Sequence, residues 1–287
     1  MSLAAAAIIP HGGIVVDPDS LLVGEHPGLE GAHADALALR GAALSAAAVL
    51  AAADPSLIVL ITPHGFASDS DWGIYDGNAR ASGQASGGTP VEVALDTARS
   101  KELLAALRDS GVPACGISFG AEQGSAAWPQ PAHVLAGSRA DMPLFWGEVN
   151  PLYFAMAACD PTNPPRVVII SLPTRQCVHK QSPPQCDFQG RLGAIACAYM
   201  DGHQKGFRAE CEQVAGVLSS WVDRMGRDER VGLLVSADLS HTHRTQAHLP
   251  GYTQGLGVQP FAIISEEAAR IYYVRPVATT LQHLSLC

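Results

Sequence analysis

Two histidines of this chain each follow a short apolar run, a position that suits metal chemistry. His11 and His64 both lie in a Pro-His-Gly tripeptide, at residues 10–12 and 63–65. A β-branched run that stops at Pro and Gly is typical of a buried strand that ends abruptly. Open α/β sheets gather their ligands at the carboxyl ends of strands. We therefore expect the two imidazoles to lie on neighbouring strands, where they could share one metal ion.

A third histidine has the same kind of position. The apolar run at residues 230–236 leads to His241, with Asp238 and Ser240 close enough to orient its ring. Any one of these histidines is equally well explained as a capping or hydrogen-bonded loop residue. Three of them at equivalent strand ends favour an active site.

Two neutral imidazoles and one carboxylate form the facial triad of non-haem Fe(II) oxygenases. Such a centre leaves open positions for a bidentate catecholate and for O2. A histidine outside it can take a proton from the substrate hydroxyl and return it later. A pair of strand-end histidines also suits Zn(II), so a zinc hydrolase stays open. The spacing of the residues does not identify the carboxylate.

Apolar runs and helical patterns alternate along the chain and predict the elements that hold these histidines. Further strands are expected at residues 112–118 and 166–172, and helices at 34–53, 94–110 and 191–224. This alternation is typical of an α/β fold with a central sheet that helices cover on both faces. No domain boundary interrupts it, so we expect a single domain over the whole chain.

Two other segments bear on a possible pocket. Residues 68–90 are rich in Gly, Ser, Asp and Asn, which predicts a long loop with an edge strand, either lining a pocket or on the surface. Residues 141–154 place aromatic residues and prolines around Gly147 and Glu148. That pattern predicts a pocket wall with one buried carboxylate.

The composition argues against several functional classes. The chain has 287 residues, 47% of them hydrophobic and 16% charged, and its net charge of −9 with scattered cations disfavours nucleic-acid binding. No uninterrupted apolar stretch reaches the roughly 20 residues that span a membrane. The seven cysteines form no CxxC pair, which disfavours a zinc ribbon and favours a reducing cytoplasm.

Several short motifs resemble the class III extradiol ring-cleavage dioxygenases, the superfamily of the protocatechuate 4,5-dioxygenase catalytic subunit, with the Memo-like proteins as relatives. They fall in the family's order over most of the chain: Pro-His-Gly (10–12), Thr-Pro-His-Gly (62–65), Trp-Gly-Ile-Tyr (72–75), Trp-Gly with Pro-Leu-Tyr-Phe (146–154), Ser-Leu-Pro-Thr-Arg (171–175), Ser-Ala-Asp-Leu-Ser-His (236–241), Gly-Tyr (251–252) and Gln-Pro-Phe (259–261). The resemblance implies a mixed central sheet flanked by helices on both faces. It also implies that His11 and His64 bind Fe(II) and that His241 is the acid/base histidine.

The same resemblance implies the remaining site residues. Iron-dependent members use a glutamate downstream of the acid/base histidine as third ligand, and Glu266 and Glu267 are the only acids after His241. Glu266 is the predicted ligand, although Ser265 followed by two acids is also the pattern of a helix N-cap and first turn. Arg175 is the candidate to pair with a substrate carboxylate.

Two stretches depart from the family's pattern. Residues 176–189 form an atypical insertion with two cysteines and adjacent prolines, and the tail ends early, in the run 278–287. We expect a cytoplasmic Fe(II)-dependent extradiol dioxygenase that opens a catechol-type ring with O2, as a homo-oligomer or with a second subunit. The departures keep open a non-catalytic Memo-like or partner-subunit relative.

Overall fold

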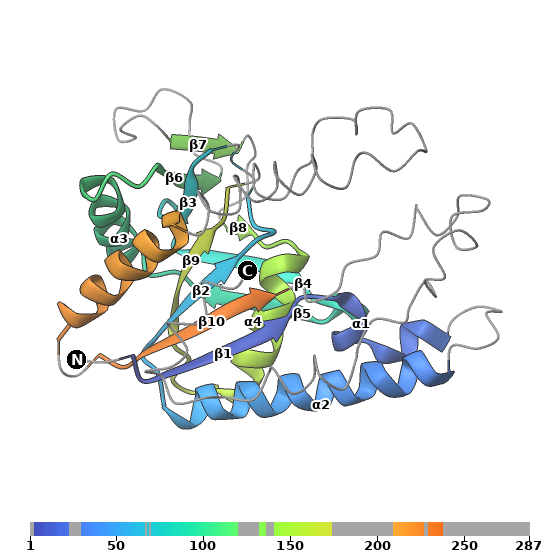
Figure 1. Cartoon of the computed structure of the whole chain (residues 1–287). Coiled ribbons are helices and arrows are strands. Elements are labelled where there is room, and N and C mark those ends of the chain that lie inside the picture. Colours follow the sequence, from blue (N-terminus) through green and yellow to red (C-terminus); the bar gives the residue numbers. More distant parts are fainter. Residues whose placement is uncertain are drawn as a thin grey trace, which may run out of the picture.

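The computed structural model describes residues 3–22, 30–66, 68, 70–119, 132–135, 141–173, 209–226 and 229–237 (Figure 1). The strands are β1 (Ala5–Pro10), β2 (Leu57–Thr62), β3 (Trp72–Tyr75), β4 (Arg80–Gln84), β5 (Pro90–Ala94), β6 (Ala114–Phe119), β7 (Ala132–Leu135), β8 (Met142–Pro143), β9 (Arg166–Ser171) and β10 (Val231–Ala237). The helices are α1 (Gly13–Val16), α2 (Glu30–Ala52), α3 (Thr97–Asp109), α4 (Trp146–Ala158) and one at residues 209–223, with short 3-10 turns η1 (Pro18–Leu22) and η2 (Ser86–Gly88).

The larger sheet is mixed and mostly parallel, with the strand order β1-β10-β2-β9-β3-β6-β7. The first four strands run parallel, β3 pairs antiparallel with β9, and β6 and β7 continue parallel to β3. A smaller sheet has the order β5-β4-β8. The predicted α/β fold with a mixed sheet is confirmed. One expectation is wrong: β1 and β2 are not neighbours, because β10 pairs with both of them.

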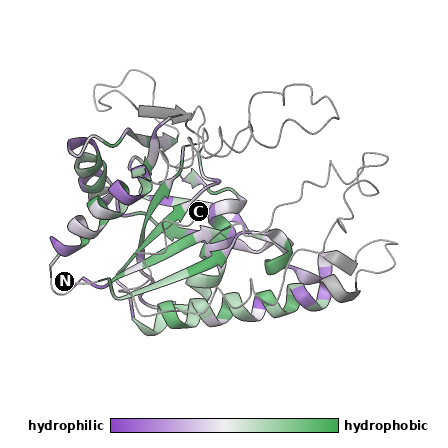
Figure 2. Cartoon of the chain, viewed as in Figure 1, coloured by the Kyte–Doolittle hydropathy of each residue, from purple (hydrophilic) through white to green (hydrophobic). Residues whose placement is uncertain are grey.

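Helices cover both faces of the larger sheet, as predicted (Figure 1). Side chains alternate along a strand, so each strand supplies both faces. Ile9, Leu60 and Leu234 belong to the cluster formed with α2 and α4. Val59 and Leu233 belong to the cluster formed with α3 and the helix at residues 209–223. Figure 2 shows the strands between these layers as predominantly hydrophobic.

The alanine-rich helix α2 is long and strongly apolar. Its segment His33–Ala52 could cross a membrane on length and composition alone, although it is not an uninterrupted apolar stretch. In the fold, Leu39 and Leu50 are buried against the sheet, as in a core helix, whereas Leu37 and Leu44 on the outer side are exposed. Packing on the sheet therefore explains the apolar inner side of this helix.

One segment differs from the sequence-based expectation, and another forms a helix where the sequence pattern predicted only a pocket wall. Residues 72–75 form the inner strand β3 rather than an edge strand, because β9 pairs with it on one side and β6 on the other. Residues 146–158 form the helix α4, although Pro151 lies inside it. The helices predicted at 34–53 and 94–110 and the strands predicted at 112–118 and 166–172 are confirmed as α2, α3, β6 and β9.

Candidate functional site

His11 and His64, the two predicted metal ligands, lie side by side just beyond the carboxyl ends of β1 and β2. Their ring centroids are 4.8 Å apart and their ring planes meet at 84°. Two imidazoles that bind one ion, with metal–nitrogen distances of about 2.1 Å and a nitrogen–metal–nitrogen angle of roughly 90°, have ring centroids about 4.5 Å apart. The pair is therefore spaced as two ligands of one ion would be, although β10 separates their strands.

The indole of Trp146, the first residue of α4, completes a cluster of three rings. Its centroid lies 4.3 Å from that of His64, with the planes tilted by 30°, and 4.7 Å from that of His11. Trp146 is 44% exposed, whereas His11 is only 1% exposed. The indole is thus a flat aromatic wall that touches both imidazoles and also faces solvent. From the sequence, Trp146 belonged to a pocket-wall pattern and to one of the family-like motifs, but it had no role of its own.

A single backbone carbonyl, that of Gly147, joins the ends of β2 and β10 to α4. Its oxygen accepts hydrogen bonds from Thr62 Oγ1 at 2.9 Å and from Ser236 Oγ at 2.6 Å. Thr62 Oγ1 in turn accepts the backbone N–H of His64 at 3.2 Å. A Cβ at position 147 would lie 2.5 Å from the Cβ of His64, so this close approach requires glycine.

His11 is anchored through both its ring and its backbone. Its Nδ1 lies 2.9 Å from Ser236 Oγ, and its backbone N–H donates to the carbonyl of Ala237 at 3.1 Å. Its own carbonyl accepts a hydrogen bond of 2.7 Å from Nδ2 of Asn150, a buried residue of α4. Ser236 and Asn150 lie in motifs noted in the sequence, but their role in holding His11 was not predicted. The available signal for Ser236 was a polar residue near the end of an apolar run.

Glu148 is the buried carboxylate that the sequence predicted. The hydroxyl of Tyr75 donates to one carboxyl oxygen, and the backbone N–H of Phe145 donates to the other at 2.6 Å. Burial raises the pKa of Glu148 to about 8, although both hydrogen bonds act to lower it. Burial and the nearby Glu148 also raise the pKa of Tyr75 well above its ordinary value. These contacts fix Glu148 at the start of α4.

The other predicted site residues, His241, Arg175 and Glu266, lie outside the described residues, as do the insertion at 176–189 and the tail. In the part of the chain that the structure describes, no group of three His, Cys, Asp or Glu side chains could hold a metal ion. By residue type, His11 and His64 match the two histidine ligands of a facial triad. Their imidazole nitrogens suit Fe(II) and Zn(II) alike.

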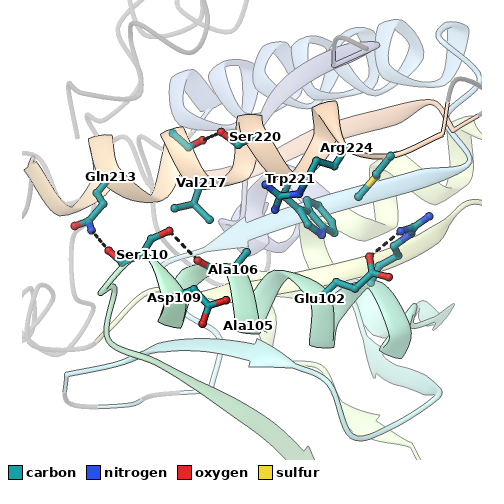
Figure 3. A pocket seen from close by; sticks show the side chains of 13 residues that line it. Glu102, Ala105, Ala106, Asp109, Ser110, Gln213, Val217, Ser220, Trp221 and Arg224 are labelled. Atoms are coloured by element: carbon teal, nitrogen blue, oxygen red, sulfur yellow. Dashed lines mark hydrogen bonds and ion pairs between the residues drawn. The ribbon is translucent and has the colours of Figure 1, made fainter.

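A separate groove lies between α3 and the helix at residues 209–223 (Figure 3). Its walls carry Glu102 and Asp109 from α3, Gln213 from the facing helix and Arg224 just after that helix ends. These two helices pack on the face of the sheet opposite to α2 and α4. The groove contains none of the predicted site residues and is distinct from the histidine pair.

Comparison with models of known protein families gives no match, and comparison with curated proteins gives none either. The likeness to extradiol dioxygenases therefore rests on the short motifs. Three of these motifs, at residues 10–12, 62–65 and 146–147, meet in space around the two imidazoles and the indole.

Proposed function

We propose that this protein is a non-haem Fe(II)-dependent extradiol dioxygenase that opens a catechol-type aromatic ring with O2. The observation that carries the proposal is the pairing of His11 and His64, with ring centroids 4.8 Å apart. The two residues are distant in sequence and follow strands that do not pair, yet their imidazoles are in contact, although β10 lies between the two strands. His241 follows the last residue of β10 by only four positions in the sequence.

Each residue has a defined role in this proposal. His11 and His64 would hold Fe(II), with Glu266 as the third ligand. The ion, when bound, supplies the Lewis acidity and redox chemistry that a catechol and O2 need in order to react. His241 takes a proton from a substrate hydroxyl and returns it after ring opening. Arg175 pairs with a carboxylate on the substrate.

The exposed indole of Trp146 supports an aromatic substrate. A flat ring that enters beside the histidine pair can stack on this indole, and such offset aromatic contacts contribute about 0.5–1.5 kcal/mol beyond area burial. An aliphatic vicinal diol has the same pair of hydroxyls but no ring to stack. We therefore expect catechols to bind in preference to aliphatic diols.

The test is anaerobic loading with Fe(II), followed by measurement of O2 uptake with a panel of catechols. We expect one Fe(II) per chain and a yellow ring-opened product. His11→Ala and His64→Ala should each abolish iron binding, whereas His241→Ala should keep iron and lose turnover. His33→Ala is the matched control, because His33 pairs with Asp19 at the protein surface and should keep both properties.

Several outcomes would overturn the proposal or its assignments. Bound iron without O2 uptake on any catechol would leave a non-catalytic Memo-like or partner-subunit relative. Binding of Zn(II) in place of Fe(II), together with ester or amide hydrolysis, would leave a zinc hydrolase. Release of iron by His241→Ala would contradict its role as the acid/base residue. Unchanged iron affinity in both Glu266→Gln and Glu267→Gln would exclude these two as the third ligand.

A further inference from the structure

The hydroxyl of Ser236 lies between a ring nitrogen and a carbonyl oxygen, and it has one hydrogen for both contacts. Ser236 Oγ is 2.6 Å from the carbonyl oxygen of Gly147 and 2.9 Å from Nδ1 of His11. A carbonyl oxygen can only accept, so the hydroxyl hydrogen is committed to Gly147. Nδ1 of His11 must therefore donate its own hydrogen to Ser236 Oγ.

The carbonyl of Gly147 is available for this contact because of Pro151. In a regular α-helix the carbonyl of residue 147 would accept the backbone N–H of residue 151. Proline has no N–H, so within α4 this acceptor is left over. The hydroxyls of Ser236 and Thr62, both buried, take its place. The proline therefore turns a helix carbonyl into an acceptor for the ends of β2 and β10.

We propose that Ser236 is a positioning residue that holds neutral His11 with its hydrogen on Nδ1, and so leaves the lone pair of Nε2 to bind a metal ion. Metal-binding histidines commonly have their second ring nitrogen fixed in this way by a carboxylate, a carbonyl or a water. Here a serine hydroxyl, itself anchored to α4, does so. The tautomer follows from the hydrogen bonds alone, whereas its consequence for iron rests on the proposed function.

NMR of the metal-free protein, labelled with 15N at histidine and held at a pH where imidazoles are neutral, reports which ring nitrogen carries the hydrogen. We expect the Nδ1–H form of His11 in the wild type and in Ser236→Thr, which keeps the hydroxyl. Ser236→Ala should move His11 toward the Nε2–H form. An Nε2–H ring in the wild type, or an unchanged tautomer in Ser236→Ala, would overturn the proposal.

Ser171→Ala is the matched control for this experiment. Ser171 ends β9 on the same edge of the sheet and is as buried as Ser236, but its hydroxyl donates to the carbonyl of Phe66 at 2.9 Å. Its removal should leave the tautomer of His11 unchanged. A shift of equal size in Ser171→Ala would show that any lost hydroxyl at this edge disturbs the ring, which contradicts a specific role of Ser236.

Pro151→Ala tests the same hydrogen bond from the acceptor's side and does not depend on folding of Ser236→Ala. The new N–H at position 151 competes with the hydroxyls for the carbonyl of Gly147. We expect a partial loss of the Nδ1–H form of His11, smaller than in Ser236→Ala. A fully retained Nδ1–H form in Pro151→Ala would overturn the role of the proline.

Titration with Zn2+ against a competing chelator measures the consequence for metal binding. Loss of a partner that orients a metal-binding histidine commonly weakens affinity about 10–100-fold, so we expect a loss in this range for Ser236→Ala. Ser171→Ala and Ser236→Thr should stay close to the wild type. Full affinity in Ser236→Ala despite a shifted tautomer would overturn this consequence. A wild type that binds neither Zn2+ nor Fe2+ would instead overturn the proposed function, while the NMR result still decides the tautomer.

Discussion

The adjacent strands β1, β10 and β2 begin and end in opposite surroundings. At and beyond their carboxyl ends, the polar side chains of His11, Ser236 and Thr62 are buried and hydrogen-bonded around one helix carbonyl. At their amino ends the polar contacts lie in solvent. Arg230 pairs there with Asp54, and the two side chains are 53% and 71% exposed.

This difference shows where the fold buries polar groups, at a cost in free energy, although packing of the sheet does not require it. A buried polar group destabilises a protein unless it is hydrogen-bonded, so the carboxyl end needs a complete network. The exposed groups at the amino end need none, because water satisfies them. Exposed polar groups could in principle form both ends of a sheet, with no buried network at either end. The buried network therefore supports the assignment of the proposed chemistry to the carboxyl end.

The largest expected effect concerns Glu148, the buried acid next to Gly147. Its pKa is raised from 4.5 to about 8, so the folded protein holds a proton that the unfolded chain releases. Stability should therefore fall as pH rises between these values, by about 3 kcal/mol from roughly pH 5.5 to pH 8. Glu148→Gln keeps a neutral side chain and should remove most of this fall. Urea unfolding at both pH values measures it.

The control for this prediction comes from the other end of the strands. Glu229 precedes β10 and pairs with Arg99 at 2.8 Å in a partly exposed position. Glu229→Gln should leave the fall in stability between the two pH values as in the wild type. Equal falls in the wild type and in Glu148→Gln would contradict the assignment of the pH effect to Glu148.

The strands and the row of residues that leads to the site were predictable from the sequence. Residues two apart on a strand lie on the same face of the sheet. On the face toward α4, an apolar residue is followed two positions later by a polar one near the end of each strand: Ile9 by His11, Leu60 by Thr62, and Leu234 by Ser236. The strand order was not predictable, because the pairing of β10 with both β1 and β2 joins segments more than 170 residues apart, as in the pair Leu57–Val231. Local patterns carry no information on such pairing.

The helix α4 was harder to predict than the histidines. Pro151 argues against a helix interior, since it removes a backbone hydrogen bond. The loss is compensated by Thr62 and Ser236, which come from two distant strands. Only the three-dimensional fold brings these hydroxyls to the carbonyl of Gly147. Pro151 therefore argues against a helix when the sequence is considered locally, yet it also leaves the Gly147 carbonyl open to the contacts that anchor the site.

Removal of a hydroxyl at the carboxyl end of β2 should lower stability by an intermediate amount, and removal of one at the amino end should lower it less. Thr62 is buried, donates to Gly147 and accepts the N–H of His64. Thr62→Val keeps the shape and should cost about 1–3 kcal/mol, because the buried carbonyl of Gly147 and the partly buried N–H of His64 each lose a partner. Ser56, just before the strand, is exposed and accepts the N–H of Arg230 at 3.1 Å. Ser56→Ala should cost no more than about 0.5 kcal/mol. Equal costs in urea unfolding would contradict the contrast between the two ends.

The smallest effect is expected from the ion pair at the amino end. Arg230 donates to the carbonyl of Asp54 at 2.6 Å and pairs with its carboxylate. Because both side chains are exposed, Arg230→Ala should cost at most about 1 kcal/mol. The cost should shrink at roughly 1 M salt, where screening is strong.

Asp54 allows the backbone contribution to be separated from that of the ion pair. Its φ of 47° lies in the left-handed region, which glycine adopts without strain. Asp54→Gly loses the ion pair but keeps the hydrogen bond from Arg230 to the carbonyl of residue 54, and it relieves the backbone. It should therefore be more stable than Arg230→Ala in thermal unfolding. A cost above about 2 kcal/mol for Arg230→Ala exceeds what exposed pairs contribute. Such a cost would mean that the amino end holds the strands as firmly as the buried network does.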